Sequence, residues 1–191
     1  MSTTPTSSRL KFRRFIKSDG QLLYTLDNDP EVMRYINGGT PTSREIIETK
    51  ILPTFINETV AHSVFGFWIA CETESNRCIG WFNLRLKNAD STEATIGYRL
   101  LRDYWGKGYA TEGARALIDT GFKSAELRRV SGTTYEENIA SRGVMEKLGL
   151  RFIRNFRLDL ADQQTAHFES TEAWPGFDVE YAVTKEQWLQ K

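Results

Sequence analysis

Residues 101–113 read Leu-Arg-Asp-Tyr-Trp-Gly-Lys-Gly-Tyr-Ala-Thr-Glu-Gly and connect a strand-like run to a predicted amphipathic helix. Gly106 and Gly108 flank Lys107 and let the backbone of this turn approach a ligand closely. The helix that follows offers several unpaired N–H groups and the positive end of its dipole. We therefore expect the turn to hold a phosphate or pyrophosphate. Glycines also end strands for purely structural reasons, and this spacing matches neither a Walker loop nor a full dinucleotide-binding fingerprint.

Length and composition favour a single globular domain, which we place at residues 9–191. The chain has 191 residues, with 25 Lys and Arg against 25 Asp and Glu, so its formal net charge is zero. This balance argues against a nucleic-acid partner but leaves room for a local phosphate site. No run of apolar residues is long enough for a membrane span. The polar residues 1–8 predict a disordered N-terminal tail rather than a signal peptide, and we expect a cytoplasmic protein.

The cysteines and histidines predict neither a metal site nor a disulfide. Cys71 and Cys78 have six residues between them across a predicted hairpin. They are able to face each other, but in a cytoplasmic protein we expect two reduced structural cysteines. His62 and His167 lie in predicted loops, far apart in the sequence, and no metal-ligand spacing is present.

Hydrophobic periodicity and capping residues predict a mixed α+β layered domain. Helices are expected after Ser18 and Asp19, from Asp29-Pro30, and from Thr42 to Pro53, where the proline ends the helix. Strands are expected at 9–16, 63–71, 78–86, 92–101, 128–135, 150–158 and 177–184, and two further helices at 109–123 and 138–148. A polar loop at 161–176 separates the last two strands.

A second segment, Asn138-Ile-Ala-Ser141, begins the helix at 138–148. Asn138 is a typical helix N-cap, and Gly149 suits a left-handed helix end, so both are explained by structure alone. The segment nevertheless follows the glycine turn with one strand between them. This pairing favours a shared ligand.

Four motifs together resemble the GNAT superfamily of acyl-CoA-dependent N-acetyltransferases. They are Ile96-Gly-Tyr-Arg-Leu100, Trp105-Gly-Lys-Gly-Tyr-Ala-Thr-Glu112, Asn138-x-x-Ser141 and Met145-Glu-Lys-Leu-Gly149. The resemblance spans roughly residues 9–188. It implies a three-layer α+β fold, in which helices flank a mixed, mostly antiparallel central sheet.

The chain is most similar to the branch that acetylates N-terminal amines of ribosomal proteins. Leu10-Lys-Phe-Arg-Arg14, Asp29-Pro-Glu-Val-Met-Arg-Tyr-Ile36 and Val179-Glu-Tyr-Ala-Val183 carry this further likeness. It implies an amine acceptor and a monomer or homodimer.

The resemblance also implies where acetyl-CoA binds. Backbone amides of the turn would hold its pyrophosphate, at Trp105, Gly106, Lys107, Gly108, Tyr109, Ala110 and Thr111. Trp105 departs from the Gln or Arg of the family pattern. Backbone groups near Leu100 and Leu101 would hold the pantetheine arm and polarise the thioester carbonyl. Asn138 would contact that arm, and Ser141 would lie near the thiol.

Amine acetylation needs a proton acceptor, because only the neutral amine is nucleophilic. The family's frequent Glu falls on Thr95 here. Glu93, two residues earlier on the same strand face, is a candidate base through a water and equally an ordinary exposed residue. The family's thiol-protonating Tyr falls on Met145, which cannot donate a proton. Ser141 is then the best remaining donor, by hydrogen bond rather than as a true acid, and Tyr135 is a weaker candidate.

The sequence therefore predicts an acetyl-CoA-dependent N-acetyltransferase that transfers the acetyl group directly to a primary amine. The acceptor is a protein N-terminus or a small amine such as a polyamine, an amino acid or an aminoglycoside. A CoA-binding or regulatory module with little catalysis is the alternative, because Thr95 and Met145 replace two family catalytic residues. No metal is expected to take part.

Overall fold

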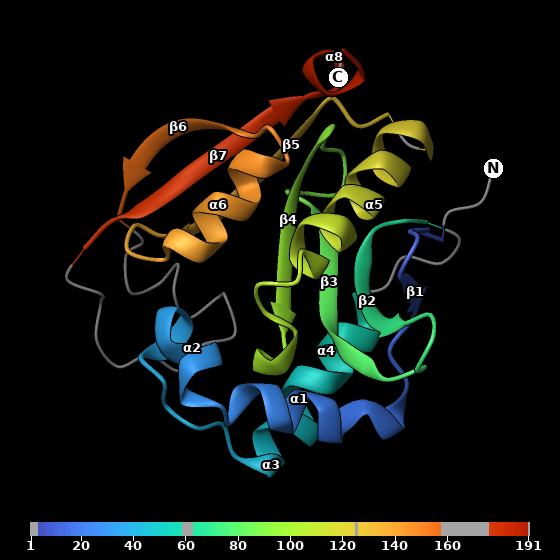
Figure 1. The fold of residues 1–191 in the computed structure, drawn as a ribbon, viewed down its shortest axis with the longest axis vertical. Coiled ribbons are helices and arrows are strands. Elements are labelled where there is room, and N and C mark those ends of the chain that lie inside the picture. The colour runs from blue at the N-terminus through green and yellow to red at the C-terminus, as the bar shows by residue number, and fades with distance from the viewer. Residues whose placement is uncertain (1–3, 59–62, 125, 158–175, 191) are drawn as a thin grey trace.

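The computed structural model describes residues 4–58, 63–124, 126–157 and 176–190. These residues form a seven-stranded sheet in the order β1-β2-β3-β4-β5-β7-β6 (Figure 1). Within the described sheet, β4 and β5 are parallel and all other neighbours are antiparallel, which confirms the mixed, mostly antiparallel prediction. The strands are β1 (Leu10–Arg13), β2 (Gly66–Glu72), β3 (Cys78–Leu86), β4 (Glu93–Leu100), β5 (Arg129–Tyr135), β6 (Arg151–Phe156) and β7 (Asp178–Thr184).

The parallel pair β4 and β5 diverges soon after it begins. Its register runs from Glu93 opposite Arg129 to Thr95 opposite Ser131. Beyond that point β4 continues to Leu100 and β5 to Tyr135, while β5 stays paired with β7 on its other edge. Two strand ends that separate within one sheet leave their backbone edges available to a ligand.

Helices α5 (Tyr109–Ser124) and α6 (Ile139–Lys147) cover one face of the sheet (Figure 1). Alternate residues of β4, including Ala94, Ile96 and Leu100, join the core on this side. Gly113 brings α5 close to β3, because a Cβ there would collide with the ring of Phe82. The first half of α5 therefore packs directly on β3, where Phe82 is the register partner of Tyr98 on β4.

The other face is covered by the N-terminal helices: η1 (Lys17–Asp19), α1 (Gly20–Asp27), α2 (Pro30–Asn37), α3 (Arg44–Ile46), η2 (Ile47–Ile51) and α4 (Leu52–Asn57). Leu23, Leu26 and Phe55 from this layer pack with Phe67 and Trp81 of the sheet. The helix–sheet–helix arrangement confirms the predicted three-layer fold. No helix within the described ranges is long and apolar enough to cross a membrane.

Two helix predictions need correction. The helix expected to end at Pro53 continues to Asn57, because the chain passes through the π-helical turn η2 and Pro53 falls in the tolerant first turn of α4. Its N-cap is Ser43, which accepts a 3.2 Å hydrogen bond from the N–H of Ile46, rather than Thr42. A last helix, α8 (Lys185–Leu189), was not anticipated, although Thr184 and Gln187 form the capping box that marks its start.

The N-terminal segment and the polar loop lie at the limits of the described residues. Residues 4–8, expected to be disordered, include Ser7, whose hydroxyl donates to a carboxylate oxygen of Glu112 at 2.8 Å. Nearly all of the predicted loop at 161–176 lies outside the described residues, as do His62 and His167.

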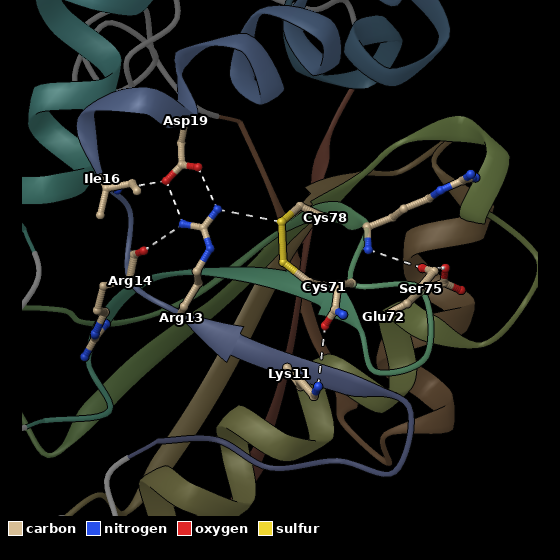
Figure 2. Close-up of a disulfide and its surroundings, with 11 residues drawn as sticks. Lys11, Arg13, Arg14, Ile16, Asp19, Cys71, Glu72, Ser75 and Cys78 are labelled. Atoms are coloured by element: carbon tan, nitrogen blue, oxygen red, sulfur yellow. Dashed lines mark hydrogen bonds and ion pairs between the residues drawn. A yellow bond between two sulfur atoms is a disulfide. The ribbon is translucent and has the colours of Figure 1, made fainter.

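The expectation of two reduced cysteines is wrong, because Cys71 and Cys78 form a disulfide (Figure 2). The two residues are register partners at the ends of β2 and β3, so the hairpin places their side chains together. The sequence-based expectation rested on the reducing conditions of the cytoplasm and did not include this strand register. Arg13 contacts the Cys78 sulfur at 3.7 Å and forms two hydrogen bonds with Asp19.

Candidate active site

A cavity of about 690 Å³ occupies the gap between the diverging strands. It runs from the turn that precedes α5 to the N-terminal helix α2. Its walls come from β4, the turn and α5, β5 and α6, and include Ile96, Tyr98, Leu100, Gly106, Gly108, Ala110, Thr133, Thr134, Asn138, Ser141 and Met145.

The cavity is lined by residues from both faces of the sheet, because side chains alternate along β4. Tyr98 and Leu100 lie on the α5–α6 side, with the core of that face. Arg99 points to the other side, where it forms a buried ion pair with Asp27 of α1 and lies 5.2 Å from the Trp81 ring. A ligand on one face can therefore meet a ligand on the other.

The glycine turn has the geometry that the sequence predicts. Gly106 and Gly108 have φ values of +72° and +82°, in the left-handed region that favours glycine. Helix α5 begins at Tyr109, so its first N–H groups point toward the cavity end. Arg9 supports the turn from outside: it donates to the Lys107 carbonyl at 3.2 Å and to Glu112 at 2.6 Å.

The cavity lining includes most, but not all, of the residues predicted to bind the cofactor. Leu100, Trp105, Gly106, Gly108, Ala110, Thr111, Asn138 and Ser141 line it, whereas Leu101, Lys107 and Tyr109 do not. The Leu101 N–H donates to the Ile79 carbonyl at 2.9 Å and so does not face a thioester. The Tyr109 hydroxyl donates to Glu72 at 2.5 Å, and the Lys107 amine lies 5.5 Å from the Tyr104 ring.

Trp105 stabilises the strand end that leads into the turn. Its indole N–H donates to the Leu100 carbonyl at 2.8 Å. This bond ties the turn to the end of β4. Trp105, which replaces the family's Gln or Arg, thus has a structural role. Its side chain leaves the backbone amides of the turn available to a ligand.

Asn138 both caps α6 and lines the cavity. Its side-chain oxygen accepts from the Ser141 N–H at 3.1 Å, and its amide donates to Thr134 at 3.1 Å. The amide has a second hydrogen. The structural and the ligand-binding interpretations of Asn138 are therefore compatible.

Ser141 has a partner that sequence reasoning missed. The hydroxyl of Tyr98 lies 3.0 Å from the Ser141 hydroxyl and 3.3 Å from its carbonyl oxygen. Burial raises the pKa of Tyr98 to about 12, so this phenol is neutral at physiological pH. Alternation along β4 puts Tyr98 on the same face as Ile96 and Leu100, but its contact with Ser141 depends on where α6 packs.

Glu93 is not brought to Ser141. It occupies the first position of β4, outside the cavity lining, and its carboxylate is bonded to Lys87 at 2.7 Å and to Arg129 at 2.9 Å. These hydrogen bonds, from Lys87 first and Arg129 second, lower the pKa of Glu93. A carboxylate held in this way is a weaker proton acceptor.

Asp178, at the start of β7, lines the cavity instead. Burial, with a smaller contribution from the nearby Glu136 carboxylate, raises the pKa of Asp178. Its register partner Tyr135 also lines the cavity and stacks on Tyr35 of α2, with ring centroids 6.1 Å apart. The sequence offered no motif that singles out Asp178. Among the described residues, no group of three or more His, Cys, Asp or Glu side chains is placed to hold a metal ion.

Comparison with known proteins identifies the domain. The family model of the acetyltransferase (GNAT) domain matches residues 9–151. FsC-acetyl coenzyme A-N(2)-transacetylase of Aspergillus fumigatus is 32% identical over 175 residues, which cover 86% of this chain and 69% of that protein. The uncharacterized N-acetyltransferase YnaD of Bacillus subtilis is 29% identical over 183 residues, covering 96% of this chain and 98% of YnaD.

Solved structures share the fold. A GNAT-family acetyltransferase of Bacillus anthracis has a TM-score of 0.76 at 26% identity, covering 96% of this chain and 99% of that one. Spermidine N-acetyltransferase of Vibrio cholerae, solved with CoA and spermine, has a TM-score of 0.72 at 16% identity, covering 94% and 98%. At that lower identity the likeness concerns the fold alone. The chain belongs to the GNAT acetyltransferase family, and it is an acyltransferase that uses acetyl-CoA as donor.

Proposed function

We propose that this protein transfers an acetyl group directly from acetyl-CoA to a primary amine, with both substrates bound at once. The observation that carries the proposal is the cavity between β4 and β5, which connects the glycine turn on one side with α2 on the other. The donor enters from the α5–α6 face, and the acceptor meets it from the α2 face. Holding both partners together supplies much of the rate by itself.

The donor is positioned by backbone groups at one end and by side chains at the other. Amides from Gly106 to Thr111 hold the pyrophosphate, where the dipole of α5 favours negative charge. The pantetheine arm follows β4 toward Ser141, with Asn138 beside it. The thioester then lies between the diverging strands.

The Tyr98–Ser141 pair acts on the leaving thiolate. The 3.0 Å contact permits either hydroxyl to donate. We assign Tyr98 as the donor to Ser141, so that the Ser141 hydrogen points toward the sulfur. A fixed donor at a developing negative charge lowers the barrier more than water does. Met145, at the position of the family's tyrosine, only fills space here.

The acceptor is a peptide N-terminus or a small amine. The resemblance to the ribosomal-protein branch of the family supports the first. Spermidine acetylation by a protein of the same fold makes a polyamine a reasonable member of a test panel.

The test combines binding with turnover. Calorimetry measures CoA affinity, and thiol release is followed with spermidine, kanamycin, and peptides beginning with Ala or Ser. We expect acetyl-CoA binding and thiol release that depends on at least one amine. CoA binding with thiol release no faster than hydrolysis across the whole panel would instead indicate a binding or regulatory module.

A further inference from the structure

We propose that Asp178 binds the ammonium form of the acceptor and takes up its proton. This inference rests on the proposed amine acetyltransfer and names the group that Glu93 does not provide. It also narrows the acceptor class to amines that arrive as alkylammonium ions.

Asp178 lies on the acceptor side of the sheet. Val179, Tyr181 and Val183 are buried with the core of the α5–α6 face, so alternation along β7 directs Asp178 to the opposite face. Residues of α2, among them Tyr35, line the same cavity as Asp178. Its register partner Tyr135 ends β5 at the edge of the cavity.

Asp178 differs from the other carboxylates of the sheet in what surrounds it. Glu180, two residues later, is bonded to Arg129 and Arg154 at 2.9 Å each. Glu93 and Asp27 are also paired with cations. Within the described residues, neither an ion pair nor a hydrogen bond engages the Asp178 carboxylate. An incoming ammonium ion is a cation that can satisfy it.

The remaining charges around Asp178 do not neutralise it. Glu136 and Glu137 follow β5 and carry the same sign, and Arg142 of α6 is engaged by the Glu136 carbonyl and the Tyr181 hydroxyl at 2.9 and 3.2 Å. Across the cavity, Glu31 and Arg34 of α2 lie 3.9 Å apart, and beyond β6 Arg157 lies over the Phe177 ring at 4.7 Å. Among the cations that line the cavity, Arg34 is paired with Glu31 and Arg99 with Asp27, whereas Lys147 lies exposed at the end of α6. The charges next to Asp178 at the end of β5 are therefore negative.

The aromatic pair beside Asp178 supports the same ligand class. Tyr35 and Tyr135 both line the cavity and stack at an angle of 29°. Aromatic faces attract cations such as alkylammonium groups, and the Arg34 guanidinium already lies 5.3 Å from the centre of the Tyr35 ring. A carboxylate next to two tyrosines recognises a protonated primary amine.

The proton steps balance without a further reactant. The ammonium nitrogen gives one proton to the Asp178 carboxylate, and its lone pair then forms the N–C bond with the thioester carbonyl. As the C–S bond breaks, the nitrogen of the tetrahedral intermediate loses its second proton, which passes through solvent to the thiolate and gives the thiol. Asp178 finally returns its proton to solvent. Burial and the Glu136 charge raise the pKa of Asp178, which makes its carboxylate a better acceptor.

Asp178→Asn tests the proposal, with Asp90→Asn as the matched control. Asp90 is exposed in the turn between β3 and β4, outside the cavity lining. With the amine that turns over best in the panel, we expect Asp178→Asn to lower kcat/KM at pH 7 by about 100-fold or more. The loss should shrink as the pH approaches the pKa of the amine. CoA affinity measured by calorimetry should stay the same, which shows that the variant is folded.

A second measurement compares two amines of different basicity as substrates of the wild type and of Asp178→Asn. Trifluoroethylamine is already largely neutral at pH 7, so its acetylation should be nearly insensitive to Asp178→Asn, unlike that of ethylamine. Equal losses for the two amines, or a pH profile of Asp178→Asn that matches the wild type, would overturn the assignment. If the wild type itself acetylates no amine, the proposed function fails rather than the role of Asp178.

Discussion

The hydroxyl of Tyr98 on β4 lies 3.0 Å from the hydroxyl of Ser141 on α6, and together they bridge the two walls of the cavity. Neither residue depends on a metal or a charged partner for this contact. The phenol stays neutral because burial raises the pKa of Tyr98 to about 12. It therefore keeps its hydroxyl hydrogen throughout the working pH range.

Tyr98→Phe and Ser141→Ala should both lower kcat. Ser141→Ala removes the hydrogen bond to the thiolate, and Tyr98→Phe removes the bond that orients the Ser141 hydroxyl, so each should cost about tenfold or more in rate. The KM for acetyl-CoA should change little, because the pyrophosphate site is intact. The double variant should lose scarcely more than Ser141→Ala alone, since Tyr98 acts through Ser141. Steady-state kinetics of the three variants decide the question, and fully additive losses would show that the two residues act separately.

Gly108→Asp should abolish measurable acetyl-CoA binding. Its carboxylate would face the pyrophosphate, and the left-handed φ of +82° disfavours any side chain. Gly108→Ala separates the two effects, because its Cβ would meet only the Arg9 guanidinium, at 3.6 Å. We expect the alanine variant to lose about 1–2 kcal/mol of stability and still to bind. Calorimetric titration with acetyl-CoA measures the affinity of each variant. If Gly108→Asp bound acetyl-CoA as tightly as the wild type, the cofactor site would not be at this turn.

Asp27→Ala should destabilise the fold by about 3–5 kcal/mol, because it leaves the buried Arg99 charge without its carboxylate. Glu48→Ala is the control: Glu48 and Arg44 are exposed and 3.8 Å apart, and their pair contributes at most about 1 kcal/mol. Urea unfolding of the two variants provides the comparison. Similar midpoints for both would mean that Arg99 finds another partner or solvent.

The Cys71–Cys78 disulfide should stabilise the hairpin of β2 and β3 by about 2 kcal/mol. Reductant should therefore lower the urea midpoint of the wild type and leave that of a Cys71→Ser/Cys78→Ser variant unchanged. Thiol labelling of the purified protein reports the redox state directly. Two labelled thiols per chain without reductant, with no effect of reductant on the midpoint, would restore the original expectation of reduced cysteines.

Local patterns in the sequence predicted the helices and strands, whereas the side-chain contacts of the site depend on packing between residues far apart in the sequence. Capping residues and periodicity are local, so the starts of α2, α5 and α6 were predicted well. Glu93 was a reasonable candidate from strand alternation, but its ion pair with Arg129 joins two strands that only the folded sheet brings together.

Two residues of the site required the tertiary structure. Tyr98 lies in a motif that the sequence singles out, yet its contact with Ser141 spans 43 positions. Asp178 follows a segment outside the described residues and gains its position from pairing with Tyr135. The disulfide likewise depends on the register of β2 and β3, which turn residues alone did not specify.

Direct transfer inside one ternary complex is tested most directly by initial velocities over a grid of acetyl-CoA and amine concentrations, with thiol and acetylated amine both quantified. We predict double-reciprocal lines that intersect and one acetylated amine for each thiol released. Parallel lines together with an acetylated protein, or thiol release without acetylated amine, would contradict it.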